Sequence, residues 1–170
     1  MDREGTAAEH DQPARVTVRL VAPVSGEVVL LADVPDQVFA EEIVGPGLAI
    51  EPRSAAGGTD TVVQAPVDGT IGSLYPHAFA IETDDDRTVL VHLGIDTVTL
   101  RGEGFTLHVA SGDRVTVGQQ LITWDPDAVA AAGMSTVCVV IALQGEPADV
   151  DRLCAPGQQV ARGDVVARWR

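Results

Sequence analysis

The 170-residue chain is acidic: 25 aspartate and glutamate residues against 11 basic residues give a formal net charge of −14, with 45% hydrophobic and 21% charged residues. This size and composition fit one globular domain. The negative charge argues against nucleic acid and anionic membranes as partners, because both require a positive face. All 11 basic residues are arginine, which excludes every chemistry that needs a lysine amine.

The N-terminal residues 1–14 are polar and contain no apolar core, so they do not form a secretory signal. No later stretch is long enough and apolar enough to cross a bilayer, which argues against direct membrane insertion. We therefore expect a disordered tail over residues 1–14, followed by a single cytoplasmic domain over residues 15–170.

Short runs of Val, Ile, Leu and Thr, broken every few residues by Gly, Pro or Asp, follow from Arg15 onward. This texture predicts an all-β fold, an antiparallel β-sandwich or barrel-like domain, with an exposed connection over residues 53–60. Asp125–Gly133 is the exception, because it offers an N-cap, a proline at the first helical position, an alanine run and a terminating glycine. We expect one short helix there and a further helical turn within residues 147–153.

Two internal echoes predict a duplicated core. Ala22–Gly26 recurs as Ala65–Gly69, and Gly112–Leu121 shares the pattern G-x-x-V-x-x-G-x-x-L/V with Gly157–Val166. The second pattern suits a tight corner between strands, in which glycines accept positive φ and the apolar positions point inward.

A β-hairpin is predicted where two apolar runs flank the acidic turn Asp84–Asp86. A turn of two or four residues places His77 directly opposite His92, with Cβ atoms about 5 Å apart. The same register pairs Phe79 with Leu90, Ile81 with Thr88 and Glu82 with Arg87. A turn of three or five residues instead puts the two rings on a diagonal or on opposite faces, and no Asn-Gly decides between them.

The segment Val91–Val98 reads VHLGIDTV and is followed by LRGEGF at 100–105, with further motifs at Asp33–Gly45 and His77–Ile81. Together these segments resemble the glucose-family enzyme IIA component of the bacterial phosphoenolpyruvate-dependent sugar phosphotransferase system. The resemblance extends over nearly the whole chain after the tail. It implies a free-standing cytoplasmic phosphotransferase with a β-sandwich of the duplicated hybrid motif type.

The resemblance implies that His92 accepts a phosphoryl group on Nε2 from the histidine phosphocarrier protein and passes it to a cysteine of the IIB domain of a membrane sugar permease. His77 matches a supporting histidine needed chiefly for onward transfer. Asp36 and Asp96 match flanking carboxylates, and an apolar rim for partners falls at Val38, Phe39, Ile43, Val44 and Tyr75. No cofactor or metal is implied, and specificity for glucose, N-acetylglucosamine or another sugar lies with the membrane partner.

Elementary chemistry agrees with these roles. Histidine has a reference pKa of about 6.5, so a neutral ring offers a lone pair on one nitrogen when the other is a held N–H donor. We expect the Gly94 carbonyl to accept from Nδ1 of His92, which directs Nε2 into the cleft. Carboxylates about 5 Å from the phosphoryl group, at an effective dielectric of roughly 20, repel it by ~3 kcal/mol per charge pair and keep it labile.

Two departures from the resembled family stand out. Asp86 occupies a position where members commonly have glycine, so the hairpin turn is expected to differ in shape. The family often has a threonine near the first histidine, and here Leu74-Tyr75-Pro76 leads straight into it. Tyr75 or Thr97 remain as alternative sources of that hydroxyl.

Three other classes of function share features with this sequence. Biotinyl and lipoyl carriers are excluded, because they attach their group to a lysine. A zinc peptidase is the stronger rival: His92 and Asp96 read H-x-x-x-D, but the second ligand motif is missing and a zinc shared with His77 needs a third ligand. A purely regulatory module, whose phosphorylation decides which targets it docks against, is compatible with phosphoryl transfer.

The remaining histidines and cysteines are interpreted as structural. Neither His10 nor His108 has a companion motif. Cys138 and Cys154 are too few and too irregularly spaced for a disulfide framework or a zinc knuckle, so we expect buried, reduced thiols.

Overall fold

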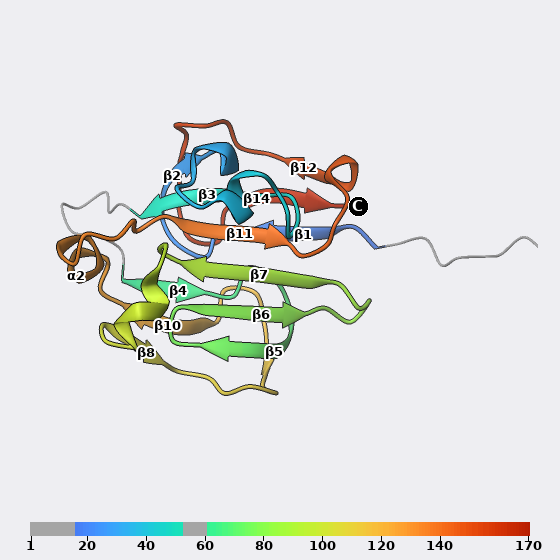
Figure 1. Cartoon of the computed structure of the whole chain (residues 1–170). Helices are drawn as coiled ribbons and strands as arrows, with labels where there is room; N and C mark the ends of the chain where they lie inside the picture. Colours follow the sequence, from blue (N-terminus) through green and yellow to red (C-terminus); the bar gives the residue numbers. More distant parts are fainter. Residues whose placement is uncertain (1–15, 53–60) are drawn as a thin grey trace, which may run out of the picture.

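Antiparallel β-strands dominate the computed structural model, which describes residues 16–52 and 61–170 (Figure 1). The predicted tail over residues 1–14 and the predicted connection over 53–60 lie outside the described residues. An eight-stranded sheet runs in the order β13 (Gln159–Val160), β2 (Gly26–Val29), β3 (Gly47–Pro52), β11 (Cys138–Ala142), β7 (Thr88–Leu93), β6 (Ala78–Glu82), β5 (Gly69–Tyr75) and β9 (Arg114–Val115). A first three-stranded sheet has the order β1 (Val18–Val21), β14 (Val165–Trp169) and β12 (Val150–Arg152). A second has the order β4 (Val62–Gln64), β10 (Gln120–Trp124) and β8 (Phe105–Leu107). The predicted all-β antiparallel class is confirmed.

The two glycine-punctuated corners predicted to be equivalent occupy equivalent places. The amide of Ala22 donates to Asp164 O at 2.8 Å, and the amide of Ala65 donates to Gln119 O at 2.8 Å. In the reverse direction the amides of Gly163 and Gly118 donate to the carbonyls of Ala22 and Ala65, each at 3.0 Å. Both glycines have positive φ, 89° and 85°, a conformation that side chains rarely adopt.

The first echo joins the two halves to each other. Val21 N donates to Pro66 O at 3.0 Å, and Gln64 N donates to Pro23 O at 2.9 Å, which is the same contact made twice with the partners exchanged. The sheet order repeats this symmetry, because β13-β2-β3-β11 and β9-β5-β6-β7 mirror one another across the β11–β7 pair. The predicted duplication is therefore confirmed, and the pseudo-symmetric centre of the large sheet lies between β11 and β7.

Of the short helices, α2 (Pro126–Ala131) is the predicted one. The Asp125 carboxylate accepts from Ala128 N at 3.1 Å, and Gly133 follows the helix with a φ of 84°. The predicted turn in residues 147–153 is helical only over its first three residues, η3 (Pro147–Asp149), and then continues as β12. No helix among the described residues combines the length and apolar character needed to cross a bilayer.

A helix that the sequence did not predict, α1 (Gln37–Ala40), covers part of the large sheet together with the 3₁₀ turn η1 (Leu31–Asp33). The Asp36 carboxylate caps α1 by accepting from Val38 N at 2.9 Å and Phe39 N at 3.2 Å. A four-residue helix is too short to produce a recognisable hydrophobic period, so the cap was its only signal.

Strand β7 separates the two hydrophobic clusters. Its residues alternate in burial, and Val89, Val91 and Leu93 enter the main core between the sheets. Leu90 faces the smaller cluster on the outer side, which contains Leu31, Val34, Phe39, Ala49, Ile95, Val137, Val139 and Ile141. By the same alternation His92 lies on the outer side, beside Phe39 of α1.

The β6–β7 hairpin has a different register from the one expected. His92 pairs with Ala78 and Thr88 pairs with Glu82, so the predicted partners His77–His92, Phe79–Leu90, Ile81–Thr88 and Glu82–Arg87 are each wrong by one residue. Thr83 N donates to Arg87 O at 2.7 Å, which closes a turn over the three residues 84–86. Asp86 makes this turn possible by adopting a positive φ of 64°. A positive φ is the conformation that glycine adopts most readily, and aspartate tolerates it at a cost.

Arg87, expected to pair with Glu82, is buried and makes other contacts. Its guanidinium donates to Trp169 O at 2.9 Å, contacts the Val16 carbonyl and lies 5.2 Å from the centre of the Trp169 ring. The hairpin turn is therefore attached to both ends of the described chain, and the charged head is held by carbonyl oxygens and by Asp85 at 2.5 Å.

Replacing Asp86 with glycine is expected to stabilise the fold by about 0.5 kcal/mol, because removal of left-handed strain, ~1 kcal/mol, outweighs the entropy that glycine adds to the unfolded chain. Urea unfolding measures this difference. The matched control, Asp127→Gly in the first turn of α2, is expected to destabilise by about 1 kcal/mol. A loss of stability in Asp86→Gly would contradict the role of the turn.

The two cysteines are free, as expected, but differ in exposure. Cys138 is buried in the main core, and burial raises the pKa of its thiol. Cys154 is half-buried, so the prediction of burial holds only for the first.

Candidate functional site

The rings of His77 and His92 meet on one face of the large sheet, with centroids 5.1 Å apart and planes at 72°. The expected convergence of two imidazoles is therefore present, although the residues are not direct partners. His77 lies in the turn between β5 and β6, outside both strands, and its carbonyl accepts from Leu93 N at 2.7 Å. Because no strand imposes its alternation on His77, the ring can reach His92. Ala78, the partner of His92, leaves room for it.

A single hydrogen bond determines the tautomer of His92. Its Nδ1 lies 2.6 Å from the Gly94 carbonyl oxygen, the contact expected from the sequence. A carbonyl only accepts, so a neutral His92 ring must carry its proton on Nδ1. Nε2 then retains a lone pair and is the nucleophilic nitrogen.

The turn at Gly94 is held by backbone hydrogen bonds to the segment that precedes β11. Gly94 N donates to Val137 O at 2.9 Å, and Ile95 N donates to Ser135 O at 3.1 Å. Gly94 has a φ of 73°, and a Cβ placed on it would lie 2.7 Å from Ser135 O and 2.6 Å from Cγ2 of Thr97. Only glycine therefore fits beside His92 without movement of the backbone.

Both histidines are shifted toward the neutral form. Burial is the main cause that lowers the pKa of His92, opposed by the bond to Gly94 and by the negative charges of Asp36 and Asp96. Burial also lowers the pKa of His77, and the proximity of His92 lowers it further. Each ring therefore has an uncharged nitrogen available at neutral pH.

Because both pKa values are lowered, we expect both rings to titrate below about 6.5, the ordinary value for histidine. The unfolded chain binds more protons in the window below that value, so the free energy of unfolding should fall as the pH drops through it. NMR titration of the two imidazoles and urea unfolding at pH 7.5 and 5.5 measure the two effects. A midpoint at or above 6.5 for either ring would show that burial does not dominate.

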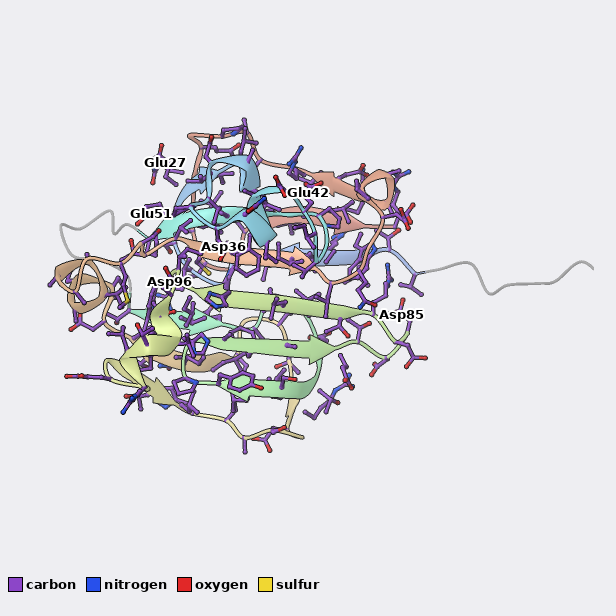
Figure 2. All side chains as sticks on the ribbon, in the orientation of Figure 1. Glu27, Asp36, Glu42, Glu51, Asp85 and Asp96 are labelled. Atoms are coloured by element: carbon purple, nitrogen blue, oxygen red, sulfur yellow. The ribbon has the colours of Figure 1, made fainter. Side chains whose placement is uncertain are left out.

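Asp36 and Asp96, the predicted flanking carboxylates, lie at the same end of β7, and Asp85 lies at the opposite end (Figure 2). Asp36 is fixed as the cap of α1, and Asp96 precedes the 3₁₀ turn η2 (Thr97–Leu100) with a φ of 62°. Both are close enough to raise the pKa of His92, so their charges act on its ring.

The predicted apolar rim is only partly exposed. Val38, Ile43 and Tyr75 are exposed, and the Tyr75 ring lies 5.9 Å from that of His77. Phe39 and Val44 do not belong to an exposed rim: Phe39 is 8% exposed with its ring 5.4 Å from that of His92, and Val44 packs against the outer cluster. Phe39 packs beside the His92 ring within the outer cluster, and Val44 is half-buried against that cluster, because the outer face of the sheet needs apolar cover.

Val98 was missed by the sequence analysis. It is 61% exposed on η2 and directly follows Thr97, the buried residue of that turn. A single exposed valine in a short turn belongs to no recognisable hydrophobic period. Its place inside the family motif was therefore the only signal in the sequence.

Of the two alternatives for the missing threonine hydroxyl, Thr97 is wrong. Its Oγ1 donates to Leu93 O at 2.7 Å, so its proton is committed to the backbone. Tyr75 packs beside His77, as described above.

The structure also bears on the two histidines outside the site and on the zinc alternative. Nε2 of His108 lies 2.7 Å from the Thr123 hydroxyl, which agrees with a structural role, and His10 lies outside the described residues. Over residues 16–52 and 61–170 no three His, Cys, Asp or Glu side chains are grouped to hold a metal ion. The zinc interpretation of His92 and Asp96 therefore has no third ligand in this part of the chain.

Comparisons with known proteins point to one family. The family model described as "phosphoenolpyruvate-dependent sugar phosphotransferase system, EIIA 1" matches residues 18–148. The PTS system glucose-specific EIICBA component of Streptococcus pneumoniae serotype 4 is 41% identical over 149 residues, which cover 86% of this chain and 20% of that protein. The chain thus spans about a fifth of this curated relative. The solved structure of glucose permease IIA from Mycoplasma capricolum matches with a TM-score of 0.79 at 33% identity, covering 91% of this chain and 96% of that chain.

Proposed function

Because the chain belongs to the EIIA 1 family of the phosphoenolpyruvate-dependent sugar phosphotransferase system, we propose that it relays phosphoryl groups through Nε2 of His92. The donor is the phosphohistidine of the phosphocarrier protein, and the acceptor is a cysteine of a IIB domain. The observation that carries this proposal is the 2.6 Å contact between His92 Nδ1 and Gly94 O, which leaves Nε2 as a free nucleophile.

The transfer needs no proton movement at His92. The Nε2 lone pair forms a bond to phosphorus while the donor's P–N bond breaks. The proton stays on Nδ1 and remains hydrogen-bonded to Gly94 O. The ring therefore becomes positively charged, which the Asp36 and Asp96 carboxylates favour. The same charges repel the phosphoryl oxygens, so the group stays transferable.

His77 supports the transferred group. As a neutral imidazole it has one N–H donor, and its ring centroid lies 5.1 Å from that of His92. A donor at this position can hold a phosphoryl oxygen as charge develops during departure to the cysteine. We therefore assign His77 chiefly to the second transfer.

Partner docking is assigned to the exposed apolar residues beside the histidines: Val38, Ile43, Tyr75 and Val98. The net charge of −14 attracts a basic phosphocarrier surface and raises its association rate at low salt. The proposed location is the cytoplasm, where such a carrier operates, and the choice of sugar belongs to the membrane partner.

Mapping of the phosphorylated residue tests the proposal. The protein is incubated with labelled phosphoenolpyruvate, enzyme I and the phosphocarrier, then digested and separated at alkaline pH, where phosphohistidine survives. We expect acid-labile label on the peptide that contains His92, and none when the phosphocarrier is omitted. Label on His77 alone, acid-stable label or no label would overturn the proposal.

A further inference from the structure

We propose that Thr97 is a positioning residue for His92, because it holds the turn that keeps the Gly94 carbonyl on Nδ1. The inference rests on the proposed phosphoryl transfer and adds a residue that does not touch the reacting atoms. Thr97 is 1% exposed, one of the few buried polar side chains among the described residues.

The hydroxyl of Thr97 closes the turn after β7. Oγ1 donates to Leu93 O at 2.7 Å, four residues earlier in the chain. Leu93 is the last residue of β7 and is buried, so its carbonyl oxygen is poorly accessible to water. Without the hydroxyl this acceptor loses a buried hydrogen bond, which gives the turn a reason to open.

The methyl group of Thr97 supports the same turn from a second direction. Cγ2 lies 2.6 Å from the position that a Cβ on Gly94 would occupy, so it fills the space beside the glycine. One side chain thus restrains both Leu93, through its carbonyl, and Gly94, through packing.

The backbone holds the other side of the Gly94–Ile95 peptide. Its N–H donates to Ser135 O at 3.1 Å, and its C=O accepts from His92 Nδ1 at 2.6 Å. A peptide whose N–H is engaged is a better acceptor at its oxygen. Thr97 supplies the side-chain part of this restraint, which makes it the part that substitution can remove selectively.

Relaxation of the turn changes the chemistry through the tautomer. If the Gly94 carbonyl withdraws, the proton is no longer held on Nδ1, and molecules with the proton on Nε2 have no nucleophile facing the phosphocarrier. Thr97 is buried and takes no part in the exposed docking residues, so loss of its hydroxyl lowers kcat and leaves KM for the carrier unchanged.

Three variants test this inference. Thr97→Val keeps the shape and removes the hydroxyl, Thr97→Ser keeps the hydroxyl, and Thr99→Val makes the same change on the same turn, where the hydroxyl donates to Asp96 O at 2.8 Å. Imidazole ¹⁵N NMR at neutral pH reports the tautomer of His92. We expect protonated Nδ1 in the wild type, Thr97→Ser and Thr99→Val, and a mixture of tautomers in Thr97→Val.

Single-turnover labelling by the phosphorylated carrier gives the second readout. We expect Thr97→Val to be slower by about tenfold or more, with unchanged KM, and the two control variants to stay within about twofold of the wild type. If Thr97→Val loses only thermal stability, with wild-type tautomer and rate, the residue is merely structural and the inference fails. The NMR measurement needs no phosphocarrier, so failure of the wild type to accept label would refute the proposed function separately.

Discussion

Replacing His92 with alanine is expected to abolish acceptance of label from the phosphorylated carrier, because the variant loses the nucleophilic nitrogen itself. In the wild type, Nδ1 of His92 is held by Gly94 O at 2.6 Å, which leaves Nε2 free, whereas Nε2 of His108 contacts the Thr123 hydroxyl at 2.7 Å. A loss of at least about a thousandfold in rate is expected when the reacting group is removed from a site of this kind.

His108→Ala is the matched control, because it removes an exposed histidine that contacts Thr123 of β10 and takes no part in the site. It should accept label at the wild-type rate. A circular dichroism melt of His92→Ala separates loss of chemistry from loss of fold. Equal labelling of the wild type and His92→Ala would show that phosphorylation occurs elsewhere.

His77→Ala should behave differently from His92→Ala. It retains His92 and the hydrogen bond from Nδ1 to Gly94 O, so it should still accept label. Without the second imidazole it should discharge slowly to the IIB domain. The measurement is the decay of labelled protein after addition of the IIB domain. Rapid discharge would remove His77 from the second transfer.

Replacing Gly94 with alanine is expected to destabilise the fold by about 2–4 kcal/mol and to slow phosphorylation of the protein that remains folded. The new Cβ would meet Ser135 O at 2.7 Å, a backbone atom that cannot turn aside as a flexible side chain can. The turn must then shift, and the carbonyl that fixes Nδ1 of His92 shifts with it.

Gly104→Ala is the control for this effect, because Gly104 also has a positive φ, 87°, but has nothing within 4 Å of the Cβ position. It isolates the strain of the backbone conformation, about 1 kcal/mol, from the collision. Urea unfolding and single-turnover labelling of the two variants are the measurements. Equal stability losses in both would mean that the space beside Gly94 adjusts freely.

The duplicated fold was predictable because glycine and proline mark its turns, and the backbone preferences of these residues depend little on the surrounding structure. Gly118 and Gly163 occupy corners with positive φ, and the prolines of the two Ala-Pro echoes mark where the halves cross. Such residues are restricted by their own backbone, so their spacing survives into the structure. The helix ended by Gly133 was recognised for the same reason.

The hairpin register was not predictable on those grounds. Asp86 tolerates positive φ but does not demand it, so a turn of three residues could not be distinguished from one of two or four. The outcome depended on Arg87, whose burial against Trp169 involves a residue 82 positions later. Local sequence contains no trace of that contact.

The sequence predicted which residues form the candidate site better than it predicted how buried each of them is. The convergence of the His77 and His92 rings, and the contact between Gly94 O and His92 Nδ1, agree with expectation, although the two histidines are not strand partners. Exposure was misjudged for Phe39 and Val44, since a motif fixes which residues gather but not which layer each occupies. For Phe39 that layer was set by α1, a helix too short to predict.

The pairing of Val18 with Trp169 brings the first and last described strands into one ladder, at the end of the molecule opposite the flanking carboxylates (Figure 1, Figure 2). A polypeptide joined directly to residue 16 or to residue 170 would therefore start from the same edge, away from the flanking carboxylates. A circular permutant that links residue 170 back to residue 16 through a short flexible bridge needs to span only the width of one strand pair.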